Sequence, residues 1–118
     1  MKESLVPGLT NRMSFEVTAD RTTDHAVHAV LATPSMIGLI EWACFGVTAE
    51  HVDSGETTVG THVCVSHESA VAKGESIDIS AELLTIEGRK LTFGVEVTGP
   101  RGRVSEGTHQ RAVIRMPG

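Results

Sequence analysis

The chain has 118 residues, 40% of them hydrophobic, which is enough for one domain, residues 1–118, with its own core. Ten basic and fifteen acidic residues give a net charge of −5, and no cluster of Lys or Arg stands out, so no nucleic-acid partner is expected. The first residues lack the long apolar stretch of a signal peptide, and the most apolar segment is too interrupted to span a bilayer. We therefore expect a cytoplasmic protein without a membrane partner.

The N-terminal part of the chain predicts one short strand and a loop. Apolar and polar residues alternate over residues 14–19, which is typical of a strand with one buried face. Residues 20–29 are polar and irregular, and they indicate a loop.

A long helix is predicted next. Thr33 and Pro34 mark its start, with Thr33 as the N-cap and Pro34 at the first helical position, where its missing N–H costs no hydrogen bond. The helix should end near residues 50–53, before a Ser-Gly turn.

After the helix, the hydrophobic period changes to two, which indicates strands. The predicted strands cover residues 59–67, 77–83, 91–97 and 104–116, with turn signals at 87–90 and 99–102. Tight turns between consecutive strands make antiparallel neighbours. The expected fold class is therefore α+β, with a five-stranded antiparallel sheet that wraps one helix.

Glu41 lies in the middle of the most apolar segment, residues 30–47. Apolar residues cover the whole circumference of this helix, and such a helix is normally buried. A carboxylate is rarely buried unless it is paired or used in chemistry. Glu41 is therefore either part of a core ion pair or a functional group. One sheet cannot cover all of this helix, so the remaining apolar surface favours a homodimer.

Three other polar residues have candidate roles. His67 continues the alternation of Val59, Val63 and Val65, so it should face the helix. Arg111 lies in mid-strand, where its charge needs a partner. Thr33 precedes Glu41 by eight residues, or about 12 Å along a helix, so the two cannot hydrogen-bond within it. If they serve one reaction centre, a substrate spans the gap or a second subunit contributes one of them.

Structural roles remain open for each of these residues. Glu41 with a His or Arg partner describes a core pair equally well, and a Thr before Pro is usually just a cap. Metal binding is weakly indicated, because Asp24, His25 and His28 have no matching second pair of ligands. No metal site is therefore predicted. The two cysteines are expected to be buried, reduced thiols.

Several segments together resemble the fluoroacetyl-CoA thioesterase family. They are the helix start Ala32–Cys44, the strand Val59–His67, the segments 80–83 and 86–91, and the last strand Gly107–Ile114. The resemblance covers roughly residues 14–115 and implies a hot-dog fold, in which a curved sheet wraps one helix and two chains pair.

The resemblance also implies a function and a site. It implies hydrolysis of an acyl-CoA, with CoA as part of the substrate and with no cofactor. It places a catalytic set on Thr33, Glu41 and His67, and it implies that Gly60 shapes the site and Arg111 supports it. The known fluoroacetyl-specific member has a longer, Phe-rich lid before the helix, whereas residues 23–31 contain no Phe. This difference argues against fluoroacetyl as the acyl group.

Thioester hydrolysis needs a nucleophile or base and donors for the oxyanion. For the implied reaction, Glu41 is expected to attack the thioester or to activate a water, Thr33 to hold the carbonyl or the partner's Glu41, and His67 to protonate the thiolate or to activate water. Backbone N–H groups near Gly60 or at the helix start are candidate oxyanion donors. Other possibilities are a non-hydrolytic protein that binds acyl thioesters or small ligands, an acyl-CoA dehydratase or isomerase, and a dimerisation module without catalysis.

Overall fold

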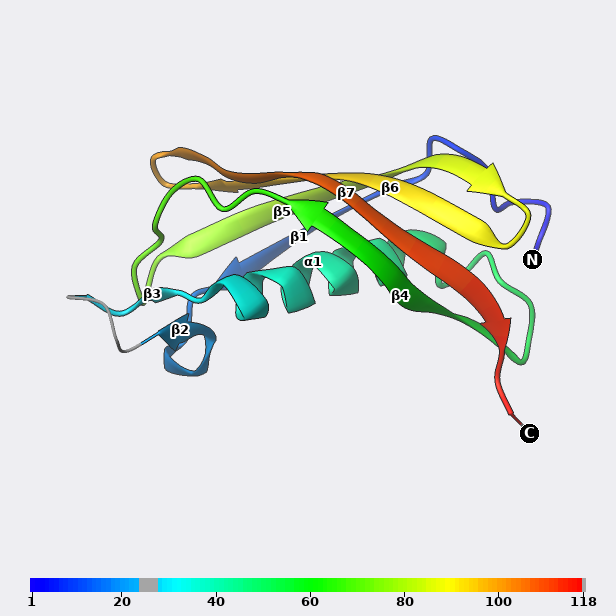
Figure 1. Cartoon of the computed structure of the whole chain (residues 1–118), viewed down its shortest axis with the longest axis horizontal. Coiled ribbons are helices and arrows are strands. Elements are labelled where there is room, and N and C mark those ends of the chain that lie inside the picture. The colour runs from blue at the N-terminus through cyan, green and yellow to red at the C-terminus, as the bar shows by residue number, and fades with distance from the viewer. Residues whose placement is uncertain (24–27, 118) are drawn as a thin grey trace.

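The computed structural model describes residues 1–23 and 28–117. The main elements are β1 (Thr10–Glu16), α1 (Thr33–Thr48), β4 (Glu56–Val65), β5 (Ser76–Glu87), β6 (Lys90–Gly99) and β7 (Gly102–Arg115). The five strands form one antiparallel sheet in the order β1-β5-β6-β7-β4. Figure 1 shows this sheet curving over α1. The α+β architecture and the strand order along the chain agree with the sequence-based prediction.

Tight hairpins connect β5 to β6 and β6 to β7, as their turn signals predicted. Gly88 and Gly102 have φ values of 62° and 115°, which glycine adopts without a steric penalty. The alternating apolar residues of these strands point towards α1, so one face of the sheet builds the core. The buried strand residues include Ile77, Ile79, Ala81, Leu83, Leu91, Phe93, Val95 and Val97.

Only one side of α1 packs against the sheet. The buried side chains follow the spacing of a single helix face and are Met36, Ile40, Ala43, Cys44 and Val47. On another face, Trp42 is 55% exposed and stacks on Phe45, with 5.3 Å between ring centroids. The side chain of Glu41 is 41% exposed. The expectation of a buried Glu41 is therefore wrong for a single chain, because the sheet leaves this side of α1 uncovered.

A β-bulge in β4 changes which residues face the helix. The pairing with β7 shifts between Gly60 and His62, so Thr61 is an extra residue in the strand. Thr58 and Gly60 point inward before the bulge, whereas Val63 and Val65 are the more buried residues after it. The prediction that Val59 shares the inward face is wrong, and Val59 is 40% exposed.

The segment predicted as a loop before α1 contains short regular elements. A 3-10 helix, η1 (Ala19–Arg21), leads into β2 (Thr22–Thr23), which pairs with β3 (Val30–Leu31). The Leu31 N–H donates to the Val71 carbonyl, and the Ala32 N–H donates to the Arg21 carbonyl. These bonds fix the chain just before α1. Part of the segment compared with a lid, residues 24–27, lies outside the described residues.

The two cysteines differ from each other. Cys44 is buried on α1, and burial raises the pKa of its thiol to about 12. Cys64 is exposed on β4, so the prediction that both are buried is wrong for Cys64. Neither forms a disulfide. Among the described residues, no helix is long and apolar enough to cross a membrane.

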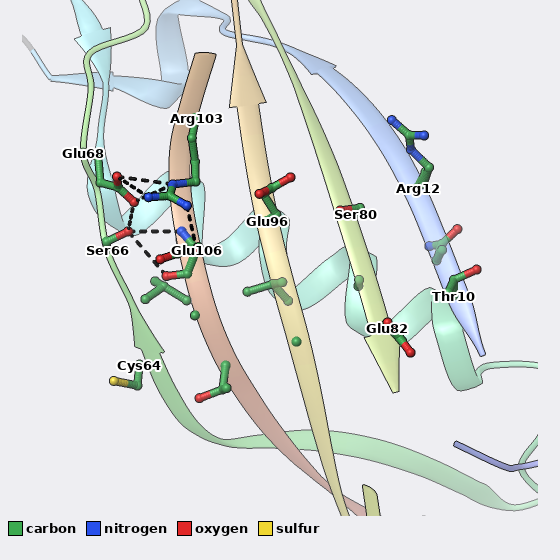
Figure 2. Close-up of a pocket in the computed structure, with 17 residues that line it drawn as sticks. Thr10, Arg12, Cys64, Ser66, Glu68, Ser80, Glu82, Glu96, Arg103 and Glu106 are labelled. Carbon is green, nitrogen blue, oxygen red and sulfur yellow. Dashed lines mark hydrogen bonds and ion pairs between the residues drawn. The ribbon is translucent and has the colours of Figure 1, made fainter. Parts of the chain in front are cut away.

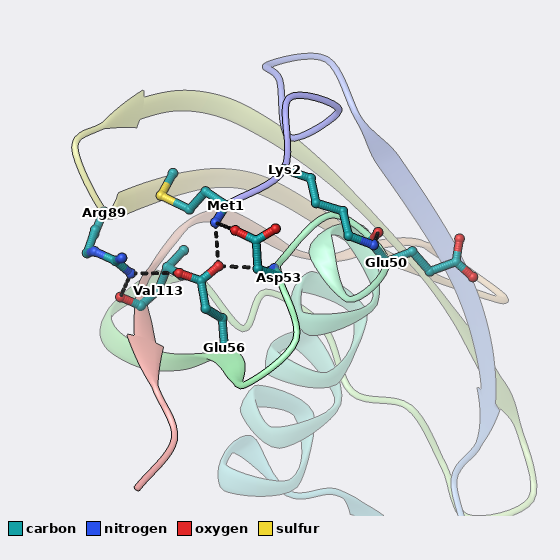
Figure 3. Close-up of polar contacts among 7 residues, drawn as sticks. All are labelled: Met1, Lys2, Glu50, Asp53, Glu56, Arg89 and Val113. Atoms are coloured by element: carbon teal, nitrogen blue, oxygen red, sulfur yellow. Dashed lines mark hydrogen bonds and ion pairs between the residues drawn. The ribbon is translucent and has the colours of Figure 1, made fainter. Parts of the chain in front are cut away.

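A charged cluster joins the N-terminus to the start of β4 (Figure 3). The α-amino group of Met1 forms ion pairs with Asp53 and Glu56. Glu56 also accepts from the Asp53 backbone N–H at 3.0 Å and from Arg89 Nη1 at 3.1 Å. The Met1 amine, the Asp53 N–H and Arg89 lower the pKa of Glu56 from its ordinary value of 4.5 to about 2. The Glu56 side chain is only 2% exposed, so this buried carboxylate is fully paired.

Candidate active site

The carboxylate of Glu41 lies against the backbone of β4 at Gly60. A Cβ atom at position 60 would lie 2.8 Å from Glu41 Oε2 and 3.2 Å from Cε1 of His109. A Cβ atom here would displace the carboxylate, which is the flexible end of the Glu41 side chain, so glycine at position 60 lets the carboxylate take this place against the strand. The β-bulge begins directly after Gly60, so β4 bends just beyond the point where the carboxylate lies against it.

Arg111 extends from β7 towards the same carboxylate. Its side chain is only 7% exposed, and its Nη1 lies 3.6 Å from Glu41 Oε2. The guanidinium is held from β4, because Nε–H donates to Thr58 Oγ1 and Nη2–H donates to the Thr58 carbonyl, both at 2.9 Å. It also lies 5.9 Å from the centroid of the Phe45 ring. The partner that Arg111 needed according to the sequence is therefore Glu41, with Thr58 as a second anchor.

His109 completes this group and was not identified from the sequence. It lies two residues before Arg111 on β7, so both side chains point to the same face. Its Nδ1 lies 2.8 Å from the His62 carbonyl, and its Nε2 lies 3.1 Å from Arg111 Nη1. Burial lowers the pKa of His109, and the charge of Arg111 lowers it further. The two-residue spacing from Arg111 was the signal that could have identified it.

Thr33 and His67 form a separate pair. Thr33 Oγ1 lies 2.7 Å from His67 Nδ1, which is hydrogen-bond distance. Thr33 is the first residue of α1, and Ala32 is the N-cap, so the prediction that Thr33 caps the helix is wrong by one position. The hydroxyl is directed to His67 instead. His67 follows the end of β4 at Val65, so it lies in the next loop rather than on the strand.

The five residues singled out from the sequence thus form two groups within one chain. Thr33 and His67 make one group, and Glu41, Gly60 and Arg111 make the other. Eight helical residues, or about 12 Å, separate Thr33 from Glu41. Each group borders its own open depression. The one at His67 has a volume of about 230 Å³, and the one formed by Gly38, Glu41, Trp42, Phe45 and Arg111 has a volume of about 270 Å³.

A much larger depression lies on the other face of the sheet. Figure 2 shows the labelled side chains Arg12, Glu82 and Glu96 on the side of the sheet away from α1, and the volume of the depression is about 1190 Å³. Its charged groups include the paired residues Arg103, Glu68 and Glu106. Neither group of the candidate site lines it. Size alone is therefore a poor guide here, and the chemistry points to the helix side of the sheet.

The described residues contain no group of three or more His, Cys, Asp or Glu side chains that could hold a metal ion. Asp24 and His25, two of the three residues weighed as metal ligands, lie outside the described residues.

The curled five-stranded antiparallel sheet around a single helix is the hot-dog fold. The sequence pattern of the FlK family, described as fluoroacetyl-CoA-specific thioesterase, matches residues 12–117. The chain therefore belongs to this family.

Individual relatives agree with this assignment. The fluoroacetyl-CoA thioesterase of Streptantibioticus cattleyicolor is 40% identical over 87 residues, which are 74% of this chain and 63% of that protein. The chain thus matches less than two thirds of the length of this relative. The structure of the fluoroacetyl-CoA thioesterase FlK is similar with a TM-score of 0.90 and 32% identity, over 97% of this chain and 91% of that chain. A variant of FlK in complex with fluoroacetate and CoA gives a TM-score of 0.88 and 33% identity, over 94% and 96% of the two chains.

Proposed function

We propose that this protein is an acyl-CoA thioesterase that hydrolyses a small acyl-CoA to the free acid and CoA, with Thr33, Glu41 and His67 as its catalytic residues. The observation that carries the proposal is the setting of Glu41. Its carboxylate is half-exposed, faces the guanidinium of Arg111 and lies against a strand that has no side chain at Gly60. A carboxylate that is oriented but still accessible is suited to attack a thioester or to activate a water. The family relative that binds fluoroacetate and CoA supports the substrate class.

The complete site is proposed to form between two copies of the chain. Trp42 and Phe45 present an apolar surface beside Glu41, and β4 is an edge strand of the sheet with Val59 exposed. Exposed apolar patches and free sheet edges are typical of association surfaces. Because Thr33 and Glu41 of one chain are about 12 Å apart, a second copy supplies the missing half, so that Thr33 and His67 of one subunit face Glu41 and Arg111 of the other.

The catalytic roles follow from the chemistry of each group. Either Glu41 adds to the thioester carbonyl and water then hydrolyses the acyl-enzyme, or Glu41 takes a proton from a water that attacks the carbonyl directly. In both routes the C–S bond breaks, and CoA leaves as a thiol after its sulfur gains a proton. The Thr33 hydroxyl and nearby backbone N–H groups stabilise the oxyanion, and His67 supplies or relays the proton. No cofactor or metal enters either route.

The acyl group is proposed to be small and not selected for fluorine. The depression beside Glu41 has a volume of about 270 Å³, and Trp42 and Phe45 line it. The segment 23–31 lacks the Phe residues implied for the lid of the fluoroacetyl-specific member. A panel of acyl-CoA thioesters, from acetyl and fluoroacetyl to aromatic, tests this by measuring the release of free CoA.

The assay of CoA release, together with two further measurements, distinguishes thioester hydrolysis from ligand binding and from dehydration. Release of CoA by the wild type, and its loss in Glu41→Gln, Thr33→Ala and His67→Ala, is the expected result. Tight acyl-CoA binding in calorimetry without thiol release would indicate a binding protein. Loss of water from a hydroxyacyl-CoA without thiol release would indicate a dehydratase. Near-normal turnover in all three variants would overturn the proposed catalytic set.

A further inference from the structure

The guanidinium of Arg111 is held by neutral groups on two strands. Thr58 accepts hydrogen bonds from Nε and Nη2, one through its hydroxyl and one through its carbonyl. His109 lies at Nη1, on the side where Glu41 also lies. Among the described residues, Glu41 is the one carboxylate within ion-pair distance of Arg111. The groups that orient the Arg111 guanidinium therefore also fix the position of its charge relative to the Glu41 carboxylate.

The hydrogen bonds of His109 define its protonation state. The His62 carbonyl can only accept, so Nδ1, at 2.8 Å from it, carries the proton. Nε2 then has a free lone pair, and it accepts from Arg111 Nη1 at 3.1 Å. The ring is fully buried and stacks on Phe93, with 6.3 Å between ring centroids. His109 is thus a neutral acceptor in a fixed orientation, and it can hold Arg111 only in this form.

We infer that His109 and Thr58 are positioning residues of the Glu41 site, which act by fixing the Arg111 guanidinium against the carboxylate. This inference rests on the proposed catalytic role of Glu41. The close approach of His109 Cε1 to position 60 adds to it, since the glycine makes room for both the carboxylate and the imidazole.

The charges around His109 agree with a neutral imidazole. Burial disfavours the imidazolium most, and Arg111 on its own strand and the His62 ring on β4 also disfavour it, while the His62 carbonyl and Glu41 on α1 favour it. The balance lowers the pKa of His109. A protonated ring would turn an N–H donor and a positive charge towards the guanidinium and would release Arg111 from its position. Activity should therefore fall at acidic pH together with protonation of His109.

Two matched pairs of variants test the inference by kinetics. His109→Leu and Thr58→Val remove the imidazole and hydroxyl acceptors at nearly constant volume and leave the carbonyl of residue 58 in place, whereas His109→Gln and Thr58→Ser keep a side-chain acceptor. We expect the first two to lower kcat roughly tenfold or more, with KM changed by less than about twofold, since small misplacements at a reaction centre are costly. His109→Gln and Thr58→Ser should recover most of the loss, and Thr85→Val, on an exposed position of β5, serves as a control.

Two kinetic outcomes would overturn the inference. One is an unchanged kcat in His109→Leu and Thr58→Val. The other is a lowered kcat that well-folded His109→Gln and Thr58→Ser do not recover.

A second measurement does not depend on activity. In ¹⁵N NMR spectra of the full chain, His109 should show a protonated Nδ1 and a bare Nε2 at neutral pH, and the Arg111 Nε–H signal should be protected from solvent exchange. Thr58→Val, which removes the acceptor of Nε–H, should reduce that protection while leaving most backbone amide signals in place. An Nε2-protonated His109, or an Arg111 signal unaffected by Thr58→Val, would contradict the inference. A wild type that hydrolyses no acyl-CoA would instead contradict the proposed function, and the NMR result would still decide how Arg111 is held.

Discussion

Glu41 and Glu56 are two carboxylates that lie at the edge of the same core, each beside an arginine, but their surroundings differ. Glu56 is 2% exposed and accepts from the Met1 amine, the Asp53 N–H and Arg89 (Figure 3). Glu41 is 41% exposed, and its arginine is 3.6 Å away, beyond hydrogen-bond distance. The first carboxylate has its hydrogen-bonding capacity filled by the protein, whereas the second keeps capacity for another molecule.

This difference separates a structural ion pair from a group available for chemistry. A buried charge that is fully paired stabilises the fold only as long as every partner is present. A carboxylate that is oriented from one side and open on the other is held ready for a substrate. Substitutions at Glu41 and at Glu56 should therefore change different properties of the protein.

Replacing each carboxylate by its amide should affect different properties. Glu41→Gln should lower turnover of a responsive acyl-CoA by roughly a hundredfold to ten-thousandfold, the usual range for loss of a general base, with little change in Tm. Glu56→Gln should leave kcat per folded molecule near the wild-type value and lower Tm by on the order of 5 °C. Activity assays and thermal melts of both variants measure this contrast. Equal losses of activity in Glu41→Gln and Glu56→Gln would contradict the distinction between a catalytic and a structural carboxylate.

The hydroxyl of Thr33 should matter for activity but not for folding. Thr33 is exposed and its hydroxyl contacts His67, so Thr33→Ala should lower kcat by roughly a hundredfold, as expected for the loss of one oriented donor, without lowering Tm. Thr33→Ser keeps the hydroxyl and should retain most of the activity. Thr85→Ala provides a matched control on β5. A fully active Thr33→Ala would exclude Thr33 from the catalytic set.

The pH dependence of the free energy of unfolding should reveal the lowered pKa of Glu56. Its pKa is about 2 in the folded protein against an ordinary value of 4.5, so the folded state favours the ionised form. This contribution to stability is complete above about pH 5 and is lost as the pH falls towards 2. In urea unfolding at pH 7, 4 and 2.5, the difference in the free energy of unfolding between wild type and Glu56→Gln should therefore shrink as the pH falls. A difference that stays constant over this range would contradict the assigned pairing.

The two thiols should differ in reactivity. Cys44 is buried, with a pKa raised to about 12, so it should react with a disulfide reagent only after unfolding. Cys64 is exposed and should react in the native protein. A thiol titration should count one reactive group per native chain and none in Cys64→Ser. The same variant gives a clean background for assays of CoA release, and two reactive thiols in the native wild type would contradict the position of Cys44.

Much of the fold could be read from the sequence because it depends on periodicity. The Thr33-Pro34 start and the continuous apolar run placed α1, the alternation after it placed the later strands in the right order, and Gly88 and Gly102 marked hairpins that need positive φ. The pattern failed at Val59, because a bulge at Thr61 reverses the alternation and no residue type announces it. It also missed the short β2 and β3, which tertiary hydrogen bonds hold in place.

The candidate site was predictable only in part, for similar reasons. Glu41 was conspicuous because it interrupts an apolar helix, and Arg111 because it interrupts a strand. The position of Thr33 suggested a cap, but the helix begins one residue earlier, so its hydroxyl is directed to His67 instead. His109 looked ordinary among polar neighbours, and its role depends on a carbonyl from another strand. Contacts made between strands leave no local signature in the sequence.

A mixing experiment with two inactive variants tests the central claim most directly. Thr33→Ala and Glu41→Gln are each purified, then unfolded and refolded together in equal amounts so that the chains can pair at random, and release of CoA is measured. If Thr33 of one chain serves Glu41 of another, half of the dimers are mixed and each has one intact site, so roughly a quarter of the wild-type activity should return. Each variant refolded alone should stay inactive. A mixture as inactive as its components would contradict a site shared between two chains.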